Sequence, residues 1–255
     1  YKWPDFVERC TQTLRTKETA AQYAAMSKDA QGNIKDVGGF VAGSLNGERR
    51  KKENVISRSM LTLDLDFVNM PAADLWDEID SGLEYTALVY SSHSHTPEKP
   101  RLRLIIPTSR DMAPNEYEPI ARRIAAEIGI NQFDDTTYEL PRLFYWPSTS
   151  KDAEYVFEYQ DGPACNVDQI LAQYVDYRDV SAWPVSSREG DVIAHEIKKA
   201  GDPTEKPGLI GAFCRAYTID DAIDKFLFDV YAPTTTDGRY SYINGSTSGG
   251  LVTYD

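Results

Sequence analysis

The chain alternates between short apolar runs and longer stretches in which apolar residues recur at helical spacing. Four runs rich in Val, Leu, Ile and aromatic residues have the length and composition of strands. They lie at 85–92, 101–107, 143–146 and 155–157. Residues 115–128 show the spacing of an amphipathic helix, and Pro71 begins another, since proline suits the first turn of a helix. Because strands and helices are mixed along the chain, we predict an α+β or α/β core.

The last third of the sequence changes in character. A connector at 177–190 leads to a highly charged segment, predicted to be helical, that ends at Ala200, and a turn-rich stretch follows at 201–207. We therefore expect a large domain over 1–200 and a small one over 201–255. The small domain is expected to hold two short helices joined at Thr218, which is suited to an N-cap, and a closing hairpin. The helices span 208–217 and 220–230, and the hairpin strands span 239–243 and 250–254.

Composition narrows the class of protein. The 255 residues carry a formal charge of -13, which argues against a nonspecific nucleic-acid coat protein but not against an enzyme that acts on nucleic acid through one groove. The three cysteines are far apart and form no Cys-x-x-Cys pair, so we expect no zinc site, no disulfide framework and a reducing cytoplasm. No apolar run is long enough to span a membrane, so no membrane partner is expected.

Two aspartates lie one residue apart in the apolar run 60–68. Side chains alternate along a strand, so Asp64 and Asp66 share one face while Leu63, Leu65 and Phe67 take the other. Two neighbouring carboxylates repel each other, and a divalent cation relieves that repulsion. Hard oxygen ligands of this kind suit Mg²⁺ or Mn²⁺, although a half-exposed sheet also produces such pairs by simple alternation.

A second constellation surrounds the turn at Pro97. On an extended backbone Ser91, His93 and His95 point the same way, and Arg101 and Arg103 share a face. If the flanking strands form a hairpin, the register that opposes His95 to Arg101 also opposes His93 to Arg103. Such a strip is rich in cations and hydrogen-bond donors, and arginine matches phosphate oxygens well. A solvated polar hairpin tip is the simpler interpretation, more so for His95 and Arg101 than for His93 and Arg103.

Two histidines two residues apart also occur in zinc hydrolases and in rolling-circle nicking enzymes. The nicking motif needs a bulky apolar residue between them, and Ser94 does not meet that need. A zinc site needs a further ligand, and His195 lies in a charged segment with no partner motif. Both interpretations are therefore disfavoured.

A third constellation follows the helix at 115–128. The acidic pair Asp134 and Asp135 precedes Arg142, which opens an apolar strand. A third carboxylate would complete a site for two metal ions, and Arg142 would then bind a triphosphate or a template. Such acidic pairs often only cap turns, so the motif is weak by itself.

Together, the three constellations resemble the archaeo-eukaryotic primase superfamily. Its pattern is an acidic pair on a strand, then Ser-x-His on a strand, then an apolar residue followed by an acid. The matching stretches here are 63–66, 91–93 and 133–134. More closely, the chain resembles the primase-polymerase region of phage and prophage replication proteins of the virulence-associated protein E-like kind. That resemblance extends over nearly the whole chain through 34–41, 95–104, 142–148, 207–214 and 245–251.

The resemblance implies an α+β fold, in which an RRM-like catalytic core is followed by a small helical module of the primase C-terminal kind. It implies a DNA primase-polymerase that uses dNTPs or NTPs, acts on a single-stranded DNA template and primer, and works in the cytoplasm of a bacterial host. A superfamily III helicase is expected downstream in the full-length protein. Asp64, Asp66 and Asp134 would bind two Mg²⁺ or Mn²⁺ ions, with Asp134 preferred to Asp135 because Phe133 supplies the preceding apolar residue.

The same resemblance assigns the triphosphate to the second constellation and to Arg142. Ser91, His93 and Arg103 would bind it, and a shifted motif would use His95 and Arg101 instead. The basic cluster Arg49, Arg50, Lys51 and Lys52 is a candidate for template phosphates, although a solvated loop explains each of the four equally well.

Two other classes of function account for part of the pattern. A glycosyltransferase would use Asp64 and Asp66 to hold Mn²⁺ and a nucleotide-sugar, but it leaves the strip of Ser91, His93 and Arg103 unexplained. A non-catalytic replication-initiator module would bind DNA without needing Asp64.

Overall fold

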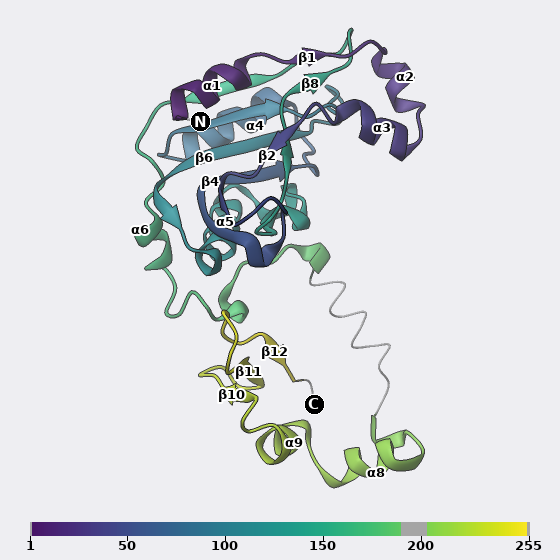
Figure 1. Ribbon diagram of the computed structural model, residues 1–255, viewed down its shortest axis with the longest axis vertical. Coiled ribbons are helices and arrows are strands. Elements are labelled where there is room, and N and C mark those ends of the chain that lie inside the picture. Colours follow the sequence, from purple (N-terminus) through teal and green to yellow (C-terminus); the bar gives the residue numbers. More distant parts are fainter. Residues whose placement is uncertain (1, 190–202, 254–255) are drawn as a thin grey trace. The chain divides into compact units, whose positions relative to one another are not determined.

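The computed structural model describes residues 2–189 and 203–253 (Figure 1). It divides into two compact units, Tyr1–Leu171 and Ala172–Asp255. The boundary expected after residue 200 lies outside the described residues, as do the charged helix that precedes it and His195.

The first unit is built on a five-stranded sheet in the order β3-β4-β6-β5-β9, with antiparallel pairing throughout. Its longest strands, β4 and β6, are central, and each contains 11 residues. The strands are β3 (Gly43–Leu45), β4 (Val55–Leu65), β6 (Leu102–Met112), β5 (Ala87–Ser91) and β9 (Phe157–Gln160). Strands β4, β5 and β6 overlap the predicted apolar runs, although β6 continues well past residue 107. Strand β9 shares only Phe157 with the run at 155–157, and β3 falls in none of the runs.

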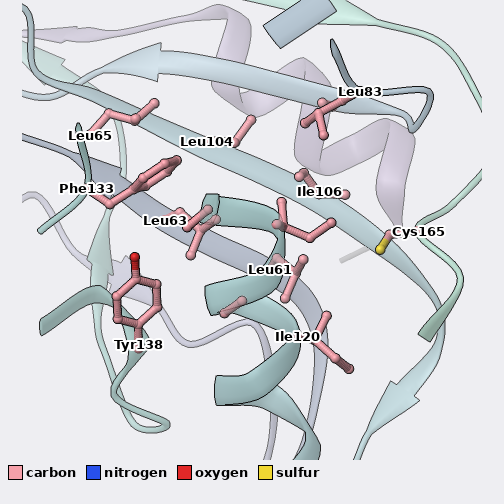
Figure 2. Close-up of a cluster of buried hydrophobic side chains, with 14 of the residues drawn as sticks. Leu61, Leu63, Leu65, Leu83, Leu104, Ile106, Ile120, Phe133, Tyr138 and Cys165 are labelled. Atoms are coloured by element: carbon pink, nitrogen blue, oxygen red, sulfur yellow. The ribbon is translucent and has the colours of Figure 1, made fainter. Parts of the chain in front are cut away.

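Two helices, α4 (Ala72–Gly82) and α5 (Pro114–Ile128), pack on one face of this sheet. Leu61, Leu63 and Leu65 of β4 point into the core beneath them, together with residues of β6 and α5 (Figure 2). The succession β4-α4-β5-β6-α5, with both helices on one face, is that of an RRM-like core. The predicted α+β class is confirmed. Phe67 is an exception to the predicted alternation, because β4 ends at Leu65 and the Phe67 side chain is exposed.

The opposite face of the sheet is only partly covered. Helix α1 (Trp3–Thr11) and the short antiparallel pair β2 (Gly39–Phe40) and β7 (Phe144–Tyr145) pack there through aromatic rings. Phe6 of α1 contacts the rings of Phe40 and Trp146. The other small elements are β1 (Leu14–Arg15), which is parallel to β8 (Ser148–Thr149), the helices α2 (Ala20–Ala24) and α3 (Lys28–Lys35), and α6 (Val167–Leu171). The part of this face near the C-terminal end of β4 holds the polar residues described below.

The second unit contains two helices and a three-stranded antiparallel sheet. Helices α8 (Gly208–Ala216) and α9 (Ile219–Phe226) lie where two helices are predicted, and the Thr218 hydroxyl accepts the Asp221 N–H as an N-cap. The strands are β10 (Tyr231–Pro233), β11 (Arg239–Tyr242) and β12 (Leu251–Val252), of which β11 and β12 pair within the segments predicted as a hairpin. Across the described ranges, no helix combines the length and the apolar character needed to cross a bilayer.

Candidate active site

A cleft of about 410 Å³ opens on the face of the sheet that α4 and α5 leave free. Residues of every sequence constellation line it, although they come from segments that are distant along the chain. The lining consists of Lys35, Arg50, Asp64, Asp66, Ser92, His93, Ser94, Arg101, Arg103, Glu139, Arg142, Leu143, Tyr145 and Ser148. Five of these residues are lysine or arginine and three are acidic. The cleft is therefore a local excess of positive charge on an acidic chain.

The strand register brings each candidate acid to an arginine. Asp64 on β4 lies directly opposite Arg103 on β6, and Arg103 Nε donates to Asp64 Oδ1 at 3.0 Å. Asp66 follows the end of β4 and accepts from Arg101 Nη1 at 2.8 Å. The predicted sharing of a face by Asp64 and Asp66, and by Arg101 and Arg103, is confirmed.

The third acid joins this pair through a backbone contact. The Asp134 N–H donates to the Asp64 carbonyl at 2.9 Å, and the Asp64 N–H donates to the Thr137 hydroxyl at 2.8 Å. The Asp134 carboxylate accepts from Arg142 Nη2 at 3.2 Å. It also accepts from the Thr136 N–H at the start of the short 3₁₀ turn Asp135–Tyr138, so the turn-capping interpretation of this motif holds as well.

The three carboxylates influence one another electrostatically. Burial raises the pKa of Asp66, and the negative charges of Asp64 and Asp134 add to that rise against the opposing effect of Arg101. Lys35 extends from the end of α3 into the same cleft, where burial and the positive charge of Arg103 lower its pKa. The three acids are thus electrostatic neighbours, although they come from separate motifs and Asp134 does not line the cleft itself.

His93 is held by a buried polar network at the wall of the cleft. Its Nε2 lies 3.1 Å from Glu18 Oε1 and its Nδ1 lies 3.0 Å from the Ser148 hydroxyl. Glu18 also accepts from Thr16 and Ser150. Burial opposes ionisation of Glu18, but hydrogen bonds from Thr16, its own backbone N–H and His93 together lower its pKa, so the carboxylate is ionised. An ionised carboxylate only accepts hydrogen bonds, which places the imidazole proton on Nε2 and leaves Nδ1 to accept from Ser148.

Ser91 and His95 do not reach the cleft. The Ser91 hydroxyl is buried against β9 and accepts the Val156 N–H at 3.0 Å. The His95 ring is buried, and its Nδ1 accepts the Arg101 N–H at 3.2 Å. The register that would oppose His93 to Arg103 is wrong, because Arg103 lies opposite Tyr90 and the segment 92–100 forms a broader turn.

The basic cluster is divided by the structure. Arg50 lines the cleft and donates to the Pro141 carbonyl at 2.7 Å. Arg49, Lys51 and Lys52 are exposed outside it, and Lys51 pairs with Glu53 at 3.4 Å.

Sequence patterns did not single out several cleft residues as site residues. Lys35, Glu139, Tyr145 and Ser148 line the cleft but belong to no metal or phosphate motif, and the same is true of Glu18, which contacts His93. Glu18 and Lys35 come from the N-terminal segment, whose path over the sheet is set by the aromatic contacts of α1 and β2. Lys35 lies within 34–41, and Tyr145 and Ser148 lie within 142–148, two stretches that carried the family resemblance, and this is the one signal that pointed to these three residues.

The acidic and histidine side chains of the described residues are not arranged around a common metal position. Within residues 2–189 and 203–253, no group of three or more His, Cys, Asp or Glu side chains is placed to hold a metal ion. The carboxylates of Asp64, Asp66 and Asp134 are turned toward arginines instead.

Comparisons with known proteins extend this picture. Residues 1–186 match the model of a family described as "VapE N-terminal domain". No curated protein matches the chain. One similar solved structure is "Cyanophage S-2L Primase-Polymerase (PrimPol), AEP domain", which is 13% identical. The match covers 58% of this chain and 76% of that one, with a TM-score of 0.41.

Proposed function

The chain belongs to the family of VapE N-terminal domains, as its motifs predicted, and we propose that it is a metal-dependent DNA primase-polymerase. One observation carries the proposal. Asp64 and Asp66 line a cleft that is rich in lysine and arginine, and Asp134, from a distant segment, lies beside them through its backbone hydrogen bond to Asp64. Nucleotidyl transfer requires this combination, because carboxylates hold the metal and cations hold the triphosphate.

The donor set fits Mg²⁺ or Mn²⁺. Three carboxylates supply hard oxygen ligands. Burial, with the charges of Asp64 and Asp134 adding to it, raises the pKa of Asp66, and a divalent cation would offset the cost of keeping this carboxylate ionised. Asp64, Asp66 and Asp134 would hold two ions, which would activate the attacking 3′-hydroxyl and neutralise charge on the triphosphate and pyrophosphate.

The remaining residues of the cleft bind and orient the substrate. Arg101, Arg103, Arg142 and Lys35 supply positive charge for the phosphates of a dNTP or NTP. His93, fixed by Glu18 and Ser148, forms a rigid wall beside them. Catalysis by this site is positioning and electrostatics, since the mechanism needs no protein nucleophile.

The template would approach along the basic cluster. Arg49, Lys51 and Lys52 are exposed next to Arg50, which reaches the cleft, so the four residues form a path for single-stranded DNA and its primer. Residues 1–200 would serve as the catalytic domain, and 201–255 as a helical module of the primase C-terminal kind. We place the reaction in the cytoplasm of a bacterial host during replication of a phage or mobile element, with a superfamily III helicase as the partner.

Nucleotide incorporation on unprimed and primed single-stranded DNA tests the proposal. Labelled dNTPs or NTPs are supplied with Mg²⁺ or Mn²⁺, and the wild type is compared with Asp64→Asn/Asp66→Asn. The matched control is Asp77→Asn, an exposed carboxylate on α4. We expect the double variant to lose about 100-fold or more of the product, as when one major electrostatic group of an active site is removed, and the control to keep it.

A replication-initiator module is the second candidate, and one observation favours it. Each of the three aspartates is already neutralised by an arginine of the same chain, so the fold does not depend on a metal. A folded wild type that binds single-stranded DNA but incorporates no nucleotide, from either primed or unprimed template, would support this candidate and refute the primase-polymerase.

A further inference from the structure

The three arginines that pair with the site aspartates differ in how firmly they are held. Arg103 is nearly buried, with 12% of its side chain exposed, whereas Arg101 and Arg142 are 31% and 30% exposed. All three are candidates for the triphosphate when only their charge is considered. The contacts that each arginine makes distinguish Arg103 from the other two.

Arg103 is fixed on several sides. Nε donates to Asp64, Nη1 donates to the Tyr145 carbonyl at 2.7 Å, and the guanidinium lies 5.8 Å and 5.6 Å from the ring centres of Tyr90 and Phe144. Burial opposes its charge, but Asp64 more than compensates and raises its pKa. Turning Arg103 toward a phosphate would break both hydrogen bonds and leave the Asp64 carboxylate, itself only 13% exposed, without its partner.

Arg101 and Arg142 make fewer contacts than Arg103. The Arg101 side chain makes one hydrogen bond, to Asp66, and Arg142 bonds Asp134 with a longer contact of 3.8 Å to the exposed Glu139. Partly exposed ion pairs of this kind contribute little to stability. A triphosphate offers each guanidinium a stronger partner, while a divalent cation offers each released carboxylate another.

We propose that Arg103 is a positioning residue that holds Asp64, whereas Arg101 and Arg142 exchange their carboxylates for phosphate oxygens when the metal and nucleotide bind. This inference rests on the proposed function. In the free protein Asp66 and Asp134 are occupied, so a metal ion must compete with the arginines. Nucleotide binding draws the arginines away, and the metal and the nucleotide therefore assist each other's binding to an equal degree.

Mn²⁺ binding tests the exchange without requiring turnover. The affinity is measured by electron paramagnetic resonance of free Mn²⁺, with and without a non-hydrolysable dNTP analogue. In the wild type we expect the analogue to tighten Mn²⁺ binding about tenfold. Arg101→Gln and Arg142→Gln should each bind Mn²⁺ alone about threefold or more tightly than the wild type, because the competing cation is gone, and each should lose most of the coupling.

Arg103→Lys provides the contrast. It keeps the charge but loses the planar fork that joins Asp64 to Tyr145, so we expect a lower melting temperature and weaker Mn²⁺ binding, with the coupling factor preserved. Damage to the fold alone does not change this factor, which compares two states of one variant. Arg110→Gln, an exposed arginine paired with Glu116 and Asp168, is the matched control.

The outcomes separate the inference from the proposed function. Mn²⁺ and nucleotide binding without coupling would overturn the exchange and leave the primase-polymerase site in place. Loss of coupling in Arg103→Lys, with tighter binding of Mn²⁺ alone, would make Arg103 an exchanging residue and overturn the division proposed here. A folded wild type that binds neither Mn²⁺ nor nucleotide would refute the proposed function and the inference together.

Discussion

Asp64 and Arg103 illustrate how far single residues in this chain can be interpreted. Alternation along each strand indicates which face of the sheet the side chain takes, and the two residues carry opposite charges. The antiparallel register then places them directly opposite each other. Cross-strand neighbours of opposite charge stabilise a sheet, so this pair has a structural role before any ligand binds. The same logic applies to His93, whose partners Glu18 and Ser148 come from other segments.

We expect Glu18→Gln to remove the preference of the His93 imidazole for one tautomer. The amide introduced by this substitution can donate as well as accept, so the preference for a proton on Nε2 disappears. Nitrogen NMR of labelled histidine should show one tautomer in the wild type and a mixture in the variant. Without the charge-assisted hydrogen bonds, the free energy of unfolding should fall by about 1–2 kcal/mol.

Glu158→Gln, at an exposed position of β9, is the control and should change neither readout. An unchanged tautomer in Glu18→Gln would show that Ser148 alone orients the ring.

The buried histidines predict a loss of stability in mild acid. Burial lowers the pKa of His93 against the opposing effect of Glu18, and burial lowers the pKa of His95 against Glu154 and Glu98. A lowered histidine pKa means that the unfolded chain takes up protons first as the pH falls through the ordinary value of 6.5. The contribution of the two buried neutral histidines to stability is therefore complete above pH 6.5 and declines below it.

Melting temperatures between about pH 7.5 and 5.5 check this expectation. The wild type should melt at progressively lower temperature over that range, and His93→Gln and His95→Gln should each show a shallower decline. Equal slopes in the wild type and both variants would assign the acid sensitivity to other groups.

At the scale of elements, β4 organises the first unit through Arg58. Arg58 precedes the apolar run 60–68 in the sequence, but β4 begins at Val55, so Arg58 lies within the strand, where it is fully buried. It donates to the Ala42 carbonyl at 2.9 Å and to the Leu140 carbonyl at 2.6 Å, and its guanidinium lies 4.0 Å from the centre of the Tyr117 ring. Arg58 thus links β4 to the segment before β3, to α5 and to the loop that carries Arg142.

Arg58→Met should destabilise the protein strongly. Methionine fills a similar volume but makes none of the four hydrogen bonds of the guanidinium. The Leu140 carbonyl is left without this donor, whereas the Ala42 carbonyl keeps the Ser59 N–H, and a buried unpaired group costs about 1–3 kcal/mol. We expect a decrease of about 3 kcal/mol or more in the free energy of unfolding, measured by urea denaturation. Arg110→Met is the control, because its ion pairs are exposed and worth about 1 kcal/mol or less. Similar decreases in the two variants would mean that the buried guanidinium has no special role.

At the scale of the whole molecule, charge is unevenly distributed. The chain carries -13 overall, yet five cations line one cleft and three more lie exposed beside Arg50. A strongly negative surface repels DNA everywhere else, so binding should be confined to this region and should weaken steeply with salt.

Single-stranded DNA affinity as a function of salt measures the number of phosphates that the protein neutralises. Lys51→Gln/Lys52→Gln should reduce the slope of log affinity against log salt by about 0.7 for each phosphate that these lysines neutralise. Lys2→Gln/Arg110→Gln removes the same charge elsewhere and should leave the slope unchanged. A salt-independent affinity in the wild type would contradict the predicted path for the template.

Much of the fold follows from local patterns. The amphipathic helix α5, the apolar strands β4, β5 and β6, and the Thr218 N-cap are each encoded by residues close together in sequence, because alternation and helical spacing are properties of neighbouring positions. The segment 4–26 has a helical pattern with a break near Arg15, and the structure has α1 and α2 there with β1 between them, paired with β8. A two-residue strand has no periodicity of its own and depends on its partner.

The sequence by itself determined the α+β class, the shared face of Asp64 and Asp66, the shared face of Arg101 and Arg103, and the family. Only the tertiary structure decided that Asp134 lies beside Asp64, that Ser91 and His95 lie outside the cleft, that Lys35 lines the cleft and that Glu18 holds His93. The physical reason is the range of the interactions. Hydrophobic alternation acts between adjacent residues, whereas register, burial and ion pairing join segments that are distant in sequence, and these contacts decide which charges meet.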